Sequence, residues 1–113
     1  MNFDEYQDAA IKYIAYDCEN GDVLYPLLAL GEEAGEVQGK VAKFIRKGGT
    51  LKDVPYDKEL RSALRKELGD VLWNLAALAH GLGLSLQGVA MDNINKLEDR
   101  RNRDVIVGEG DDR

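Results

Sequence analysis

The sequence predicts an all-α protein, a single domain that resembles a four-helix bundle. Apolar residues recur at steps of three and four through most of the chain, and no segment alternates with the period of two that marks a strand. Turn-forming residues interrupt this pattern three times, which divides the chain into four helical segments. The length of 113 residues fits one domain, since domains commonly hold about 100–150 residues. We therefore expect residues 1–113 to form one compact helical unit.

The first two expected helices are separated by a short polar turn. The first runs from about Phe3 to Cys18, where apolar side chains at helical spacing share one face. The segment Glu19-Asn20-Gly21-Asp22 breaks it with turn-forming residues. The second helix runs from about Leu24 to Lys47, with Pro26 in its first turn, where a missing N–H does no harm. It stops at Gly48-Gly49, because glycine readily takes the conformation that ends a helix.

Capping residues mark the third and fourth helices. After a loop over residues 50–56, Asp57 is expected to cap a third helix that continues to about Gly81. Ser85 then caps a fourth helix, which reaches about Arg101. The tail, residues 104–113, shows no helical period. Two alternatives stay open for this tail. It either docks at the active site or stays mobile.

Charge and composition exclude several classes of protein. The net charge is −6 and the sequence pI is near 4.7, so a surface of this kind repels phosphate backbones and predicts no nucleic-acid partner. No run of about 18 apolar residues is present, which predicts no membrane span. The first six residues are acidic and do not resemble a secretion signal. The lone Cys18 cannot form an internal disulfide, so we expect the cytoplasm.

Two pairs of acids lie on the second and third expected helices. Glu33 and Glu36 are three residues apart, as are Glu67 and Asp70, so each pair emerges on one side of its helix. Both pairs border the apolar stripe of their helix, so the four carboxylates converge if the stripes face each other. Such a cluster of like charges calls for a cation. Oxygen ligands without Cys or His suit Mg²⁺, with Mn²⁺ as a substitute.

Alternatives to a metal site remain open at this point. Acidic clusters on helices are usually solvated faces, and Glu36 is correctly spaced for an ordinary ion pair with Lys40. The chain would then be a non-catalytic helical module for dimerisation or partner binding. A di-iron bundle is excluded, because it needs Glu-x-x-His and the single histidine, His80, follows Ala77 at that spacing. The same shortage of histidine argues against zinc.

Four stretches of the chain together resemble the MazG-like family of the all-α NTP pyrophosphatase superfamily. Its acidic pattern, Glu-Glu-x-x-Glu followed by Glu-x-x-Asp, is matched by residues 32–36 and 67–70. The agreement extends to residues 30–37 and 67–76, to the Asn-x-x-Lys element in residues 93–97, and to residues 100–113, including the glycines and charges of 108–113. Asn74, where many relatives carry Tyr, departs from the pattern, as does a longer connection between Glu36 and Glu67. These departures bear on substrate choice and leave the acids in place.

The resemblance implies hydrolysis of a nucleoside triphosphate between its α and β phosphates, giving a monophosphate and pyrophosphate. By position, Mg²⁺ would be held by four acids: Glu33, Glu36, Glu67 and Asp70. Glu32 would be the catalytic base that orients the attacking water, or a further metal ligand. The resemblance also implies a homodimer or homotetramer.

Further residues are expected to hold the substrate. Lys96 and Arg100 would meet the phosphates, and Asn93 would bind the sugar or phosphates. Trp73 would stack on the base. The competing interpretations are an exposed helix end for the two cations and a core or dimer contact for the indole. The resemblance adds Lys40, Lys43 and Arg113 as lesser candidates for phosphate contact.

Overall fold

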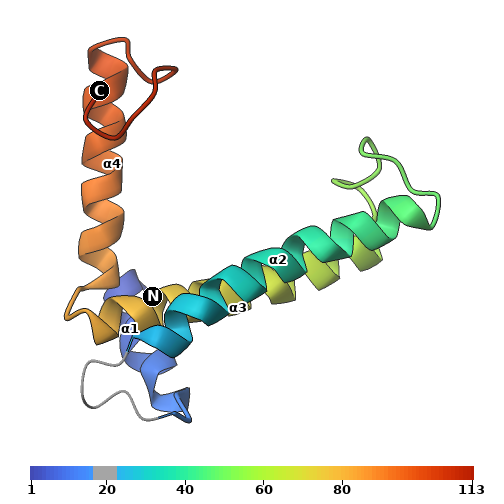
Figure 1. The fold of residues 1–113 in the computed structure, drawn as a ribbon, viewed down its shortest axis with the longest axis horizontal. Coiled ribbons are helices and arrows are strands. Elements are labelled where there is room, and N and C mark those ends of the chain that lie inside the picture. Colours follow the sequence, from blue (N-terminus) through green and yellow to red (C-terminus); the bar gives the residue numbers. More distant parts are fainter. Residues whose placement is uncertain (17–22) are drawn as a thin grey trace.

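The computed structural model describes residues 1–16 and 23–113 and contains helices without any strand in that part of the chain (Figure 1). The elements are α1 (Phe3–Ala10), a short 3-10 helix η1 (Ile11–Tyr13), α2 (Leu24–Arg46), α3 (Lys58–Gly81) and α4 (Leu86–Asn102). The all-α prediction is confirmed. Within the described residues, no helix is both long enough and apolar enough to cross a membrane.

The predicted N-caps form at both expected helix starts. The Asp57 carboxylate accepts a hydrogen bond from the backbone N–H of Leu60 at 2.8 Å, and the Ser85 hydroxyl accepts one from the N–H of Gly88 at 3.0 Å. Each bond satisfies a donor that the first helical turn leaves free. The starts of α3 and α4 therefore follow directly from local sequence.

The first helix is shorter than predicted. We expected it to reach about Cys18, but α1 ends at Ala10 and η1 at Tyr13, and Ile14 is extended. The indole N–H of Trp73 donates to the carbonyl of Ala10 at 3.1 Å. An α-helix would use that carbonyl for the N–H of Ile14, which bonds instead to Ile11 at 3.2 Å. A tertiary contact thus coincides with the early end; Cys18 itself lies outside the described residues.

Helices α2 and α3 form an antiparallel hairpin and make the most extensive contact of any two elements (Figure 1). The connection turns at Gly48, whose φ of 100° lies in the left-handed region that favours glycine. The acids predicted to bind metal lie near the middle of both helices. The hairpin therefore fixes their relative position within one chain.

A small core joins α1, α3 and α4 at the other end of the hairpin. Ala10, Ala76 and Leu86 are buried there, and Tyr6, Leu72 and Trp73 pack against them. The buried side chain of Gln7 links the same elements by three hydrogen bonds. Its amide donates to the carbonyls of Ala76 at 3.2 Å and Leu84 at 3.1 Å, and its oxygen accepts from the N–H of Leu86 at 2.9 Å.

Beyond this core, α4 diverges from the hairpin instead of lying along it (Figure 1). The radius of gyration is 17.0 Å, whereas a compact domain of this length has about 13 Å. The expectation of one compact unit is therefore wrong for a single copy. Among the described elements, α2 packs on α3 and makes no contact with α4, so the hairpin leaves the later turns of α4 without a second helix beside them.

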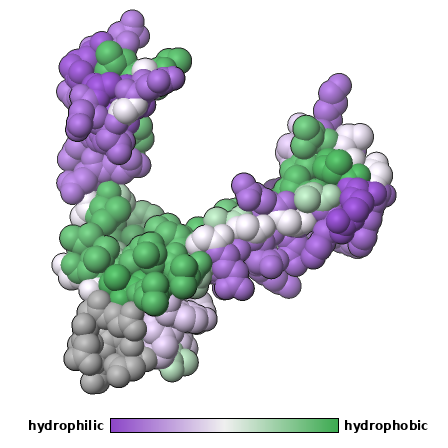
Figure 2. All heavy atoms as spheres, in the orientation of Figure 1, coloured by the Kyte–Doolittle hydropathy of each residue, from purple (hydrophilic) through white to green (hydrophobic). Residues whose placement is uncertain are grey.

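Apolar side chains are consequently exposed in two regions. Figure 2 shows apolar surface gathered where α1, the start of α2 and the end of α3 meet. Leu24, Leu27 and Leu28 of α2 are all more than half exposed. On α4, Met91 and Ile94 are exposed by 52% and 58%. Exposed apolar area of this extent is typical of surfaces that another molecule covers.

Candidate metal centre

Three of the predicted metal ligands come together in the middle of the hairpin. Glu33 of α2 and Glu67 and Asp70 of α3 each offer a carboxylate oxygen, and these oxygens lie within 4.8 Å of one another. All three side chains are half-buried. Their three-residue spacing on α3 and the antiparallel packing of α2 explain why they converge. The donor set is oxygen alone, which fits a hard divalent cation such as Mg²⁺.

Glu32 and Glu36 lie beside this group without joining it. Both side chains are exposed on α2, and neither belongs to the cluster of oxygens within 4.8 Å. Their charges still reach it. Burial, followed by repulsion from Asp70, Glu32, Glu67 and Glu36, raises the pKa of Glu33 above the ordinary value for a glutamate. Four neighbouring carboxylates therefore act on Glu33, one of the predicted ligands.

The ion pair at this site differs from the one weighed for the sequence. Lys40 does not pair with Glu36; its Nζ lies 3.2 Å from Oε1 of Glu67, across the hairpin. Both side chains are partly buried, with 34% and 17% of their surface exposed. Lys40 therefore supplies one positive charge directly beside the acids.

An aromatic pocket adjoins Asp70 on the side of α1. It has a volume of about 470 Å³ and is lined by residues that include Tyr6, Tyr13, Gly69, Asp70 and Trp73. The indole N–H of Trp73 is already bonded to Ala10, so the indole offers only its ring to this pocket. Tyr6 and Asp70 line the same pocket, and burial followed by the Asp70 carboxylate raises the pKa of Tyr6. Both expected roles of Trp73, core packing and ligand contact, are geometrically compatible.

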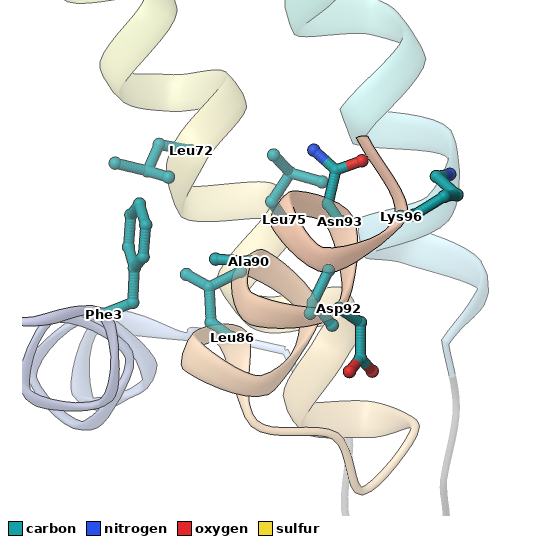
Figure 3. A pocket seen from close by; sticks show the side chains of 9 residues that line it. Phe3, Leu72, Leu75, Leu86, Ala90, Asp92, Asn93 and Lys96 are labelled. Carbon is teal, nitrogen blue, oxygen red and sulfur yellow. The ribbon is translucent and has the colours of Figure 1, made fainter. Parts of the chain in front are cut away.

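Asn93 and Lys96 lie on α4 in a second apolar pocket, at the angle between α3 and α4. This pocket has a volume of about 520 Å³, and its walls include Phe3, Leu72 and Leu75 (Figure 3). Asn93 and Lys96 are exposed at its edge. None of the three clustered acids lines it. Within one chain, the structure therefore does not bring Asn93 and Lys96 to the carboxylates.

Arg100 is occupied by the tail of its own chain. Only 5% of the residue is exposed, and its guanidinium donates to the carbonyl of Asp111 at 2.7 Å. The Asp111 carboxylate lies 3.5 Å from Arg100 and 3.9 Å from Nζ of Lys96. Arg113 folds the tail further by donating to the carbonyls of Val105, Ile106 and Gly110. In a single copy the tail thus docks on α4, so docking at the acids remains a prediction about another copy.

The remaining motif residues have structural roles that the sequence only partly indicated. Asn74, the departure from the family pattern, is buried and donates to the backbone carbonyl of Asp70 at 3.0 Å. It therefore fixes the turn that carries a predicted ligand. Gly69 leaves open space, since a Cβ there would meet no atom within 4 Å, and it lines the aromatic pocket. The sequence reasoning missed Tyr6 as a neighbour of the acids, because nothing in the sequence indicates that α1 packs beside α3.

Comparison with known proteins gives a family match. Residues 24–105 match the MazG nucleotide pyrophosphohydrolase domain. The chain is 42% identical over 118 aligned positions to the "Gene 37 protein" of Mycobacterium phage L5, and the match covers the whole of both chains. No solved structure matches the chain. The domain match spans most of the sequence, including both acidic helices, so the chain belongs to the MazG nucleotide pyrophosphohydrolase family.

Proposed function

We propose that the chain is a Mg²⁺-dependent nucleoside triphosphate pyrophosphohydrolase that cleaves between the α and β phosphates. The observation that carries this proposal is the convergence of Glu33, Glu67 and Asp70 within 4.8 Å, in a chain with the MazG domain. Glu36 completes the proposed ligand set from one turn further along α2. Mn²⁺ is the expected substitute, because it accepts the same oxygen ligands.

The proposed reaction is a single displacement at the α phosphorus. Glu32 accepts a proton from the attacking water as the new P–O bond forms, and the bond from the α phosphorus to the bridging oxygen breaks. Pyrophosphate leaves with that electron pair, and the nucleoside monophosphate remains. Bound Mg²⁺ supplies neutralisation of phosphate charge and a more acidic water.

The aromatic pocket is the proposed place for the nucleoside. It directly adjoins Asp70, and the rings of Trp73 and Tyr6 offer faces on which a base can stack. A nucleoside held there would present its α phosphate to the acids. The shape of this pocket would set which base fits best, and Asn74 would act on that choice through its bond to the backbone of Asp70.

Asn93, Lys96 and Arg100 require a second copy of the chain in order to act on the same substrate. They lie on α4, which diverges from the hairpin that carries the acids (Figure 1). The exposed apolar residues on α4 and at the start of α2 provide the surface for such an association. We therefore propose a homodimer or homotetramer. Arg100 reaches a phosphate in this assembly only when the tail releases it, because its guanidinium holds Asp111.

We place this activity in the cytoplasm, where nucleoside triphosphates are abundant and the lone Cys18 stays reduced. No part of the proposed reaction requires a nucleic acid or a membrane.

The test is product analysis of each NTP and dNTP after incubation with the purified protein, with Mg²⁺ or with EDTA. We expect a nucleoside monophosphate and pyrophosphate, in equal amounts and only with Mg²⁺. A diphosphate plus orthophosphate would show that another bond is cleaved. Absence of turnover on every nucleotide, together with absence of Mg²⁺ binding in calorimetry, would favour the non-catalytic helical module instead.

A further inference from the structure

A third pocket, lined by polar residues, lies beside the acids on the side away from the aromatic pocket. It has a volume of about 440 Å³ between α2 and the first turns of α3. We call it the lysine pocket, after Lys40, Lys58 and Lys66. Two acids, Glu59 and Glu67, and the small residues Ser62 and Ala63 complete its lining, so lysines outnumber acids there by three to two. It is large enough for a diphosphate group and opens directly beside Glu67.

The lysine pocket, the acids and the aromatic pocket follow one another along one face of α3. Ser62, Lys66, Asp70 and Trp73 are separated by four, four and three residues, so their side chains lie on the same side of the helix. Ser62 lines the lysine pocket, and Trp73 lines the aromatic pocket. At 1.5 Å per residue, Ser62 and Asp70 are about 12 Å apart along the axis. An extended nucleotide lying along this face therefore meets all three regions.

The charges at the two ends differ. The aromatic pocket presents rings and small apolar side chains, with Asp70 as its acid. At the other end, Lys58 and Lys66 make no ion pair with any acid in residues 1–16 and 23–113. Lys40 pairs only with Glu67, whose charge a bound cation would offset. Lysine ammonium groups are strong donors to phosphate oxygens.

We infer that the lysine pocket takes the β and γ phosphates of the substrate and the pyrophosphate that leaves, with the nucleoside at the opposite end of α3. This inference rests on the proposed function and adds a direction to it. The substrate lies along α3 with its base toward α1 and its terminal phosphate toward the start of α3. Lys40, Lys58 and Lys66 hold the leaving group, whereas the acids would hold the cation that faces the α phosphate.

The experiment is calorimetric titration of pyrophosphate, with Mg²⁺ present, into the full chain and its variants. For Lys58→Gln/Lys66→Gln we expect pyrophosphate affinity to fall about tenfold, since two charge-assisted contacts are lost. The matched control is Lys47→Gln/Lys52→Gln, which removes the same charge from exposed positions outside the pocket. It should bind pyrophosphate as the wild type does. Mg²⁺ titration alone should be unchanged in both.

The opposite end of the site provides a further comparison. Tyr6→Leu alters the aromatic pocket and should leave pyrophosphate affinity unchanged, although it weakens nucleotide binding. Equal pyrophosphate affinity in the wild type and the Lys58→Gln/Lys66→Gln variant would overturn the inference. So would loss of affinity in Tyr6→Leu alone, because the substrate would then lie in the reverse direction.

Failure of the inference is distinguishable from failure of the proposed function. Pyrophosphate binding is measured without turnover, so it tests the lysine pocket even if no nucleotide is cleaved. Conversely, Mg²⁺-dependent release of pyrophosphate with unchanged binding in the lysine variant would keep the proposed function and reject the direction. A wild-type protein that binds no pyrophosphate would reject the lysine pocket.

Discussion

The middle of the α2–α3 hairpin and the outer part of α4 contrast in how they are held. In the hairpin, two long helices pack against each other along their length and bring Glu33, Glu67 and Asp70 together within one chain. The outer turns of α4 bind the tail of the same chain, through Lys96, Arg100 and Arg103. Both regions carry residues that match the family motifs. Helix packing within one copy fixes the relative positions of those in the hairpin but not of those on α4.

The three acids therefore converge within one chain, whereas Asn93 and Lys96 would need a second copy to reach the same substrate. The carboxylates come together without a second copy, because each is anchored on a helix that has a packed partner. Lys96 and Asn93 lie on an arm that exposes Met91 and Ile94 to solvent. Covering such side chains on association is favourable, at about 25 cal/mol for each Å² of apolar surface removed from water. The outer part of α4 is therefore one of the two regions, with the start of α2, that a second copy would cover favourably.

The largest expected effect comes from the acids of the hairpin. Glu67→Gln or Asp70→Asn removes a charged ligand, so turnover should fall on the order of a thousandfold while the helices remain intact. Product chromatography measures the rate, and circular dichroism checks the fold. Asp8→Asn, on the exposed face of α1, is the matched control and should keep full activity. Retained turnover in both acid variants would refute the site assignment.

The next largest effect is expected from the exposed apolar side of α4. Light scattering on the wild type should give at least twice the chain mass of 12.5 kDa. Ile94→Asp places a charge on the exposed apolar side of α4, which should shift the mass to that of one chain and lower turnover about tenfold or more.

Asn102→Asp adds the same charge at an exposed polar position of α4 and should leave the mass unchanged. A monomeric wild type with full activity would show that Lys96 and Asn93 are not needed from a partner.

The smallest expected effect concerns the repulsion among the acids. Because the pKa of Glu33 is raised in the folded protein, Glu33 favours folding below its unfolded pKa and loses that contribution as the pH rises through the folded pKa. In EDTA at pH 7, Glu33→Gln should therefore raise the melting temperature by about 1–3 °C. The gain should shrink as the pH is lowered. A difference in melting temperature between the two proteins that stays constant as the pH is lowered from 7 would contradict the repulsion.

Local sequence signals predicted the helices well where the chain itself supplied the boundary. Asp57 and Ser85 cap α3 and α4 as expected, and glycine at position 48 turns the chain after α2. The end of the first helix was predicted wrongly. There, the carbonyl of Ala10 is taken by the indole of Trp73, which lies 63 residues further along the chain. Neither the helical period nor any turn residue near Ala10 predicts such a contact.

The helical class could be predicted from the sequence, because helix periodicity is a local property of the chain. The oxygen donors of Glu33, Glu67 and Asp70 follow directly from the residue types. The tertiary structure alone decided that Lys40 pairs with Glu67, that Tyr6 lies beside Asp70 and that α4 leaves the hairpin. These outcomes depend on which faces of distant segments pack together. Each apolar face can pack against several others, including those of a second copy. Local periodicity therefore does not decide which of these contacts forms.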